Sequence, residues 1–257
     1  MRTAGWLLDV LFPDDCRICG SPLTELSRYP VCAPCLLAAQ PFQAEHACSQ
    51  CHTPFLNRAP LDEQGRCALC RLGGRAYDDA WSYGAYEGPV RTLVHLLKYE
   101  GIRTLASPLG ALLSRALPRQ RQFDVIVPVP IHWRRRWMRG FNQAELLAAD
   151  LSRRTGIPVA EALERRHRPA QAGLSSAARR RNAAGAFSIA AGAALAGRKI
   201  LLIDDVLTTG STAAACASVL KRAGAARVSV LTLARADRRY GREALLANHP
   251  AVREMSA

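Results

Sequence analysis

The hydrophobic positions follow two different patterns along the 257 residues. After Gly73 and Gly74, apolar runs alternate with amphipathic stretches, whereas before these glycines the chain contains pairs of cysteines separated by twelve to fifteen residues. Strands are predicted at 80–86, 124–129, 200–203 and 228–234. Because the buried runs are continuous rather than alternating, they indicate a parallel sheet covered by helices on both faces.

Helices are predicted between these strands, at 90–98, 108–117, 142–155 and 212–223. Ser107 is expected to be the N-cap of the second helix, with proline at its first position. Asn142 followed by Glu145 predicts a capping box at the third helix, and Gly224 predicts the end of the fourth. Ligands of such sheets bind at the carboxyl ends of the strands, which makes the predicted loops 129–142 and 204–212 the candidate site.

The 200–203 strand leads into two aspartates and then into a turn rich in hydroxyl groups. Thr208, Thr209, Gly210, Ser211 and Thr212 offer hydroxyls and backbone N–H groups at a helix N-terminus, which suits a phosphate monoester. Asp204 and Asp205 would repel that phosphate, but carboxylates accept hydrogen bonds from vicinal hydroxyls. The stretch therefore predicts a sugar-phosphate site. The alternative is an acidic pair that ends a strand in a purely structural turn.

Eight of the nine cysteines form four C-x-x-C pairs, a spacing typical of zinc ligands. The pairs are Cys16/Cys19, Cys32/Cys35, Cys48/Cys51 and Cys67/Cys70. They predict two four-thiolate zinc sites, with sequential pairing as the simplest scheme and crossed pairing as an alternative. Disulfides would require an oxidising compartment. His52 is expected to be a bystander, and Cys216 to pack in the core of a helix.

The cysteine segment is expected to be a structural scaffold, because metal binding can fold a chain too short to form its own core. Contact with nucleic acid is the alternative, since arginines lie nearby at 58, 66, 71 and 75. A catalytic zinc is not expected, because four thiolates leave no open coordination position.

The net charge of +14 comes mainly from arginine, which binds phosphate bidentately. It favours a phosphate-bearing partner, although a solvated basic surface would give the same count. The first twelve residues are interrupted by Asp9, so we expect a short amphipathic helix there rather than a signal peptide. No apolar run is long enough for membrane insertion. We therefore expect a cytoplasmic protein.

Four ordered blocks of the sequence resemble a known family. They are V-P-V-P (127–130), R-G-F-N-Q-A-E-L-L-A (139–148), Q-A-G-L-S-S-A-A-R-R-R-N-A-A-G-A-F (171–187) and L-L-I-D-D-V-L-T-T-G-S-T (201–212). The last resembles the phosphoribosyl pyrophosphate (PRPP) signature of type I phosphoribosyltransferases. The chain as a whole resembles the ComF family of competence-associated phosphoribosyltransferase-like proteins, including its N-terminal double zinc ribbon. Ala178 departs from the family, which has an acidic residue before the arginines.

The resemblance implies a type I phosphoribosyltransferase fold, a parallel twisted sheet flanked by helices, preceded by a small zinc-ribbon module. It implies that Asp204 and Asp205 hold the ribose hydroxyls and that 208–212 wraps the 5′-phosphate. Basic side chains in the 129–139 loop would lie near the pyrophosphate: Arg134, Arg135, Arg136 and Arg139. The segment 171–182 would close over the site, with Arg179, Arg180 and Arg181 as candidate catalytic charge stabilisers.

These implications give an expected organisation and two alternative functions. The zinc module is expected at 1–75, the phosphoribosyltransferase-like domain at 76–240 and a tail at 241–257. The first function is magnesium-dependent transfer of a phosphoribosyl group from PRPP to an unknown acceptor, with a link to DNA uptake. The alternative is a non-catalytic sensor of PRPP or a nucleotide that binds single-stranded DNA or a DNA-processing partner.

Overall fold

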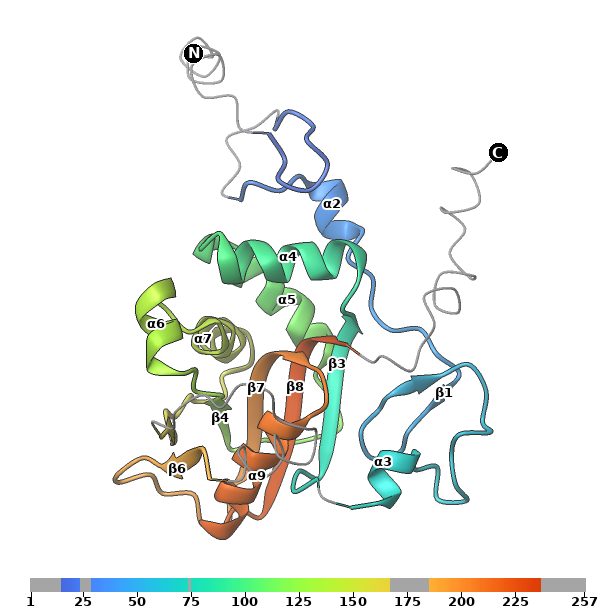
Figure 1. Cartoon of the computed structure of the whole chain (residues 1–257), viewed down its shortest axis with the longest axis vertical. Coiled ribbons are helices and arrows are strands. Elements are labelled where there is room, and N and C mark those ends of the chain that lie inside the picture. Colours follow the sequence, from blue (N-terminus) through green and yellow to red (C-terminus); the bar gives the residue numbers. More distant parts are fainter. Residues whose placement is uncertain (1–14, 24–28, 74, 167–184, 237–257) are drawn as a thin grey trace, which may run out of the picture.

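The computed structural model describes residues 15–23, 29–73, 75–166 and 185–236. At its centre lies a four-stranded parallel sheet in the order β3-β8-β7-β4 (Figure 1). Its strands are β3 (Asp79–Ala85), β4 (Val125–Pro128), β7 (Lys199–Leu207) and β8 (Arg227–Arg235). An isolated parallel bridge between Ile126 and Val159 continues the sheet beyond β4. The predicted parallel sheet is thus confirmed, with each strand close to its expected position.

One face of the sheet is covered by three helices, α4 (Gly88–Tyr99), α5 (Ala106–Ala116) and α7 (Gln143–Thr155). Leu97, Leu109 and Leu147 of these helices belong to one buried hydrophobic cluster with Leu201 and Ile203 of β7. This amphipathic packing is the reason the helices form where the hydrophobic period predicted them.

Two helix starts test the predicted caps. At α7, Asn142 is the N-cap as predicted, and its side-chain oxygen accepts a hydrogen bond from the Ala144 N–H at 3.0 Å. At α5 the prediction was wrong: a short 3-10 helix, η1 (Arg103–Leu105), runs directly into α5 and makes Leu105 its N-cap. Ser107 therefore lies inside the first turn.

The other face is covered by α9 (Ser211–Arg222) and by an antiparallel hairpin of β5 (Leu163–Arg165) and β6 (Phe187–Ile189). Cys216 on α9 is fully buried in this cluster, which confirms its predicted place in the core. Burial also raises the pKa of its thiol well above the usual value, so it remains an uncharged packing group.

The cysteine-containing segment lies along the edge strand β3 rather than apart from the sheet (Figure 1). It contains α2 (Ala33–Leu37), the two-residue strands β1 (His46–Ala47) and β2 (Pro54–Phe55), and α3 (Ala68–Arg71). The Phe42 N–H donates to the Tyr83 carbonyl at 2.8 Å, and a side chain at Gly84 would collide with the Gln40 carbonyl oxygen. This segment therefore covers the otherwise open edge of the sheet.

The segment contributes to both hydrophobic clusters. Cys16 packs in the cluster that contains α4, α5 and α7, whereas Cys48 and Cys67 pack in the cluster that contains α9. A buried arginine at the end of β8 also binds the segment around the second cysteine cluster. Arg235 donates to the Thr53 hydroxyl at 2.7 Å and to the Cys51 carbonyl at 2.6 Å. Among the described residues, no helix is long and apolar enough to cross a membrane.

Candidate functional site

The candidate site lies at the junction of β7 and α9. The prediction that β7 stops at Ile203 was wrong: the strand continues to Leu207, since Asp204 pairs in register with Thr232 of β8. The connection to α9 is then only three residues, 208–210. Gly210 has a φ of 75°, in the left-handed region, and is the N-cap of α9 without a capping side chain. The hydroxyls of Thr209 and Ser211 lie 2.9 Å apart at this helix start.

The two aspartates contact different groups. Asp205 is buried, and its Oδ2 lies 2.8 Å from the Nζ of Lys98, which comes from α4. This cation was not identified from the sequence, because Lys98 lies far away in the chain on a helix predicted only for its packing. The ion pair neutralises one of the two negative charges beside the loop.

Asp204 is partly exposed and lies close enough to interact electrostatically with Cys216 and Arg165. Its carboxylate accepts the Asp205 N–H at 2.9 Å. Loss of hydration, together with the negative charge of Asp205, raises the pKa of Asp204 to about 7, while Lys98 acts in the opposite direction. Near neutral pH this group therefore exists in both protonation states.

The 129–142 stretch contains a helix where a loop was predicted, α6 (Trp133–Arg139). The three successive arginines 134–136 are exposed on it, and Arg136 pairs with Glu145 of α7 at 2.6 Å. Arg139 stacks over the ring of Tyr99 at 5.0 Å. Arg135 lies near Arg165, which in turn interacts with Asp204. Arg135 is thus linked to Asp204 only through Arg165, whereas Arg136 pairs with α7.

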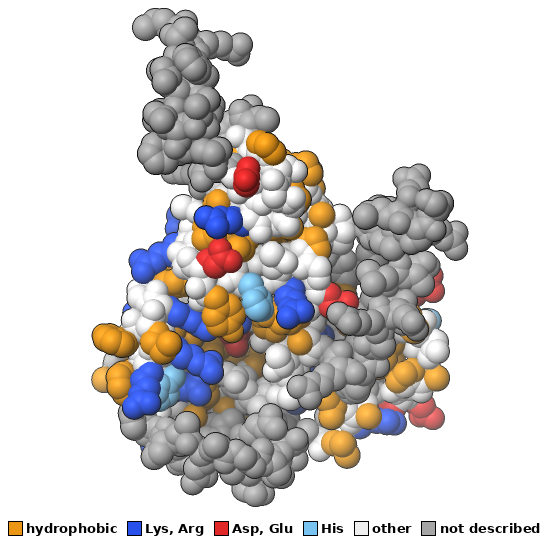
Figure 2. Space-filling model, turned by 45° about the horizontal axis from the view of Figure 1, so that its top comes forward, with side chains coloured by type: hydrophobic (Ala, Val, Ile, Leu, Met, Phe, Trp, Pro, Cys, Tyr) orange, Lys and Arg blue, Asp and Glu red, His pale blue; other side chains and the backbone are white. Residues whose placement is uncertain are grey.

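Basic and hydrophobic side chains intermingle on the α6 side of the molecule (Figure 2). Trp137 is 83% exposed and Met138 79% exposed, and Trp133 is half exposed with the guanidinium of Arg134 over its ring at 5.5 Å. Contiguous exposed apolar side chains are a common feature of interaction surfaces.

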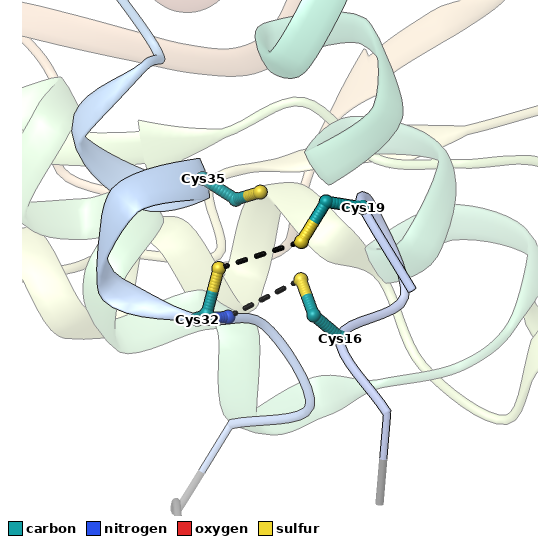
Figure 3. A group of neighbouring side chains, drawn as sticks. All are labelled: Cys16, Cys19, Cys32 and Cys35. Atoms are coloured by element: carbon teal, nitrogen blue, oxygen red, sulfur yellow. Dashed lines mark hydrogen bonds between the residues drawn. The ribbon is translucent and has the colours of Figure 1, made fainter. Parts of the chain in front are cut away.

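The eight paired cysteines form two separate clusters, in the sequential scheme: Cys16, Cys19, Cys32 and Cys35, and Cys48, Cys51, Cys67 and Cys70. The sulfur atoms of each cluster lie within 4.8 Å of one another, and those of the first point toward a common centre (Figure 3). None of the nine cysteines forms a disulfide in the structure.

The sulfur spacing fits a zinc ion. Four thiolates about 2.3 Å from a tetrahedral zinc lie about 3.8 Å from one another. The Cys19–Cys32 and Cys51–Cys67 sulfurs are each 3.8 Å apart. Backbone N–H groups also point at sulfur, from Cys32 to Cys16 and from Cys67 to Cys48, both at 3.3 Å. Both clusters can therefore hold zinc, with four thiolates and no open position. His52 stacks on Trp81 instead of joining the second cluster.

One polar group beneath the loop was missed in the sequence. Tyr77 is 1% exposed, and within the described ranges its hydroxyl has no hydrogen-bond partner. A Cβ added at Gly210 would lie 3.0 Å from this hydroxyl. A tyrosine between a cysteine cluster and a strand carries no signal in the sequence that separates it from a core residue. The candidate catalytic arginines 179–181, like the rest of 167–184, lie outside the described residues.

Comparison with known proteins decides the family. The chain is 34% identical to the DNA utilization protein YhgH of Escherichia coli O157:H7 over 231 residues, which cover 87% of this chain and 97% of that protein. It belongs to the ComF family. Competence protein F of Haemophilus influenzae is 32% identical over 228 residues, covering 85% of this chain and 90% of that one.

The fold of this ComF protein is that of the type I phosphoribosyltransferases. Residues 139–248 match the phosphoribosyl transferase domain family, a range that includes β7, the 208–210 loop and α9. A solved allosteric regulatory enzyme of purine biosynthesis superposes on 51% of the chain, and 26% of its own, at 22% identity and a TM-score of 0.37.

Proposed function

We propose that this ComF protein binds PRPP at the β7–α9 junction and transfers its phosphoribosyl group, with magnesium, to an acceptor. The observation that supports this most directly is a strand that carries two adjacent carboxylates near its carboxyl end and is joined by three residues to a helix capped by a left-handed glycine. The carboxylates and the helix start offer a diol site and a phosphate site within one short connection.

The charges near the junction favour such a ligand. Two ionised carboxylates would repel a phosphate, but Asp205 is paired with Lys98 and the pKa of Asp204 is raised by burial and by Asp205. Both carboxyl groups can still accept or share hydrogen bonds with ribose hydroxyls. The N–H groups and hydroxyls of Thr208 to Thr212 then remain for the 5′-phosphate.

The chemistry follows from where charge develops. The bond between C1 of the ribose and the pyrophosphate oxygen breaks, its electron pair leaves with pyrophosphate, and positive charge grows on the sugar. Magnesium, bound largely by PRPP itself, would offset the charge of the leaving group. Arg135, which lies near Arg165, and the candidate arginines 179–181 would supply further positive charge. The acceptor's lone pair then forms the new bond to C1.

Calorimetric titration with PRPP and magnesium tests this proposal. Asp204→Asn with Asp205→Asn is expected to abolish binding, because the diol loses both carboxylates. Asp124→Asn is the matched control, since Asp124 accepts the Lys199 N–H at the opposite end of β7. Equal affinity in the double variant and the wild type would falsify the site. Pyrophosphate release with labelled PRPP and candidate bases would then identify an acceptor.

The second candidate function is binding of single-stranded nucleic acid on α6. Exposed Trp137 beside the exposed arginines 134–136 provides a stacking face and phosphate contacts together. The relatives carry the names DNA utilization protein and Competence protein F, which supports a link to the handling of incoming DNA.

This candidate predicts binding that weakens steeply with salt. Trp137→Ala is expected to lower the affinity for a labelled oligonucleotide by about tenfold, the loss of one stacked base. Arg91→Ala, which removes an exposed charge from α4, is the control for nonspecific charge effects. Equal losses in the two variants would show that α6 has no special role.

A further inference from the structure

The buried hydroxyl of Tyr77 faces the start of α9 without a partner. Buried polar groups in folded proteins almost always form hydrogen bonds, so an unpaired one calls for an explanation. The phenol is 1% exposed, and its oxygen is the nearest atom to the position where a side chain at Gly210 would begin. Gly210 is the N-cap of a twelve-residue helix and has no capping side chain. The unpaired Tyr77 hydroxyl, a hydrogen-bond donor, therefore lies beside the N-terminus of α9, and helix N-termini attract anions.

Tyr77 is held in position by residues next to the cysteines of the second cluster. The guanidinium of Arg75 lies over its ring at 5.8 Å and donates to the Cys70 sulfur at 3.6 Å. The side-chain amide of Gln50, next to Cys51, donates to the Tyr77 carbonyl at 3.4 Å. These contacts hold the Tyr77 ring against the loop without a ligand, so the hydroxyl is already in position to bind one.

We propose that Tyr77 is a phosphate-binding residue of the 208–212 loop and that its hydroxyl donates to a phosphate oxygen of the ligand held there. The cysteine segment would then complete the site instead of only supporting the fold. This inference rests on the proposed sugar-phosphate site at the β7–α9 junction.

The phenol stays a donor throughout the physiological range, since burial raises the pKa of Tyr77 to about 12. A packing role alone would require the ring but not the hydroxyl. The two roles therefore predict opposite results for Tyr77→Phe, which keeps the ring and removes only the oxygen.

The experiment measures two quantities, the affinity for ribose 5-phosphate and for PRPP with magnesium, and the melting temperature without ligand. Tyr77→Phe is expected to weaken binding of both ligands by about 10- to 100-fold, the loss of one hydrogen bond to a charged group. The unliganded melting temperature is expected to stay the same or rise, because a buried unpaired hydroxyl has been removed.

Tyr83→Phe is the matched control. Tyr83 is also buried, but its hydroxyl donates to the Ala39 carbonyl at 2.7 Å, so its loss should lower the melting temperature and leave ligand affinity within about twofold of wild type. Unchanged affinity in Tyr77→Phe, beside a wild type that binds, would overturn this inference alone. A wild type that binds neither ligand would remove the proposed site and this inference with it.

Discussion

Replacing Lys98 by methionine tests whether its ion pair with Asp205, beneath the candidate site, stabilises the folded protein. Methionine keeps the aliphatic stem and removes the charge. The partner, Asp205, has only 4% of its side chain exposed, and that of Lys98 is 15% exposed. The variant therefore leaves a buried carboxylate without the cation that lies 2.8 Å away in the wild type.

Removing one partner of a buried pair costs about 3–5 kcal/mol, because the remaining charge is desolvated without compensation. Lys98 is partly accessible, so water can reach the vacated position and the lower end, about 3 kcal/mol, is expected. That corresponds to a fall in melting temperature of about 6–12 °C for a domain of this size. Urea unfolding gives the free energy of unfolding directly.

Two comparisons make this result decisive. Adding Asp205→Asn to Lys98→Met is expected to recover most of the loss, since no unpaired charge is then buried. Lys221→Met removes a pair of similar length, 2.7 Å to Asp78, but both of its side chains are about a third exposed. It should cost no more than about 1 kcal/mol. If Lys98→Met costs as little as Lys221→Met, the electrostatic account of the site is incorrect.

Three further predictions concern other parts of the molecule. The pKa of Asp204 is raised to about 7 from an ordinary value of 3.8, so the folded state binds more protons than the unfolded state between these two values. Stability should therefore fall as the pH rises from about 4 to about 7, and melting curves of Asp204→Asn should lose this slope. Metal analysis should find two zinc ions per chain. A colorimetric chelator should remove the two ions at different rates, because Cys19 of the first cluster is exposed whereas all four cysteines of the second cluster are buried. Release of both ions in a single phase would contradict this prediction. Arg235→Lys should lower the free energy of unfolding in urea by about 2 kcal/mol, because an ammonium group cannot form both hydrogen bonds that the planar guanidinium makes to Thr53 and Cys51. A stability equal to that of the wild type would show that these hydrogen bonds are dispensable.

The sheet could be predicted from the sequence because its strands are continuous apolar runs. The same reasoning explains the error at β7. The change from isoleucine to aspartate was interpreted as the end of the strand, but backbone pairing with β8 continues through Thr232 to Arg235. Hydrogen bonds between strands do not depend on side-chain polarity, so an acidic pair at a functional edge can lie inside a strand.

The α6 helix escaped prediction for a different reason. The prolines at 128 and 130 predict the end of the strand, and the stretch with three consecutive arginines was therefore predicted as a loop. The helix begins directly after His132, whose side chain accepts the Arg134 N–H, and it ends at Gly140, which has a φ of 73°. Such a short helix is defined by its caps more than by hydrophobic period.

Lys98 and Tyr77 show what the motif alone could not reveal. The D-D-V-L-T-T-G-S-T stretch contains the carboxylates and the phosphate loop, but the cation for Asp205 comes from α4 and the phenol beneath Gly210 comes from the segment after the cysteines. Both residues are distant from the motif in the sequence and lie beside it only in the folded structure. The two contacts also differ in charge: the Asp205 carboxylate already lies 2.8 Å from the Lys98 ammonium group, whereas the Tyr77 hydroxyl has neither a hydrogen-bond partner nor an ion pair among the described residues. A ligand phosphate should therefore change the surroundings of Tyr77 more than those of Lys98, and comparing ligand-induced stabilisation in Tyr77→Phe and Lys98→Met separates these two effects.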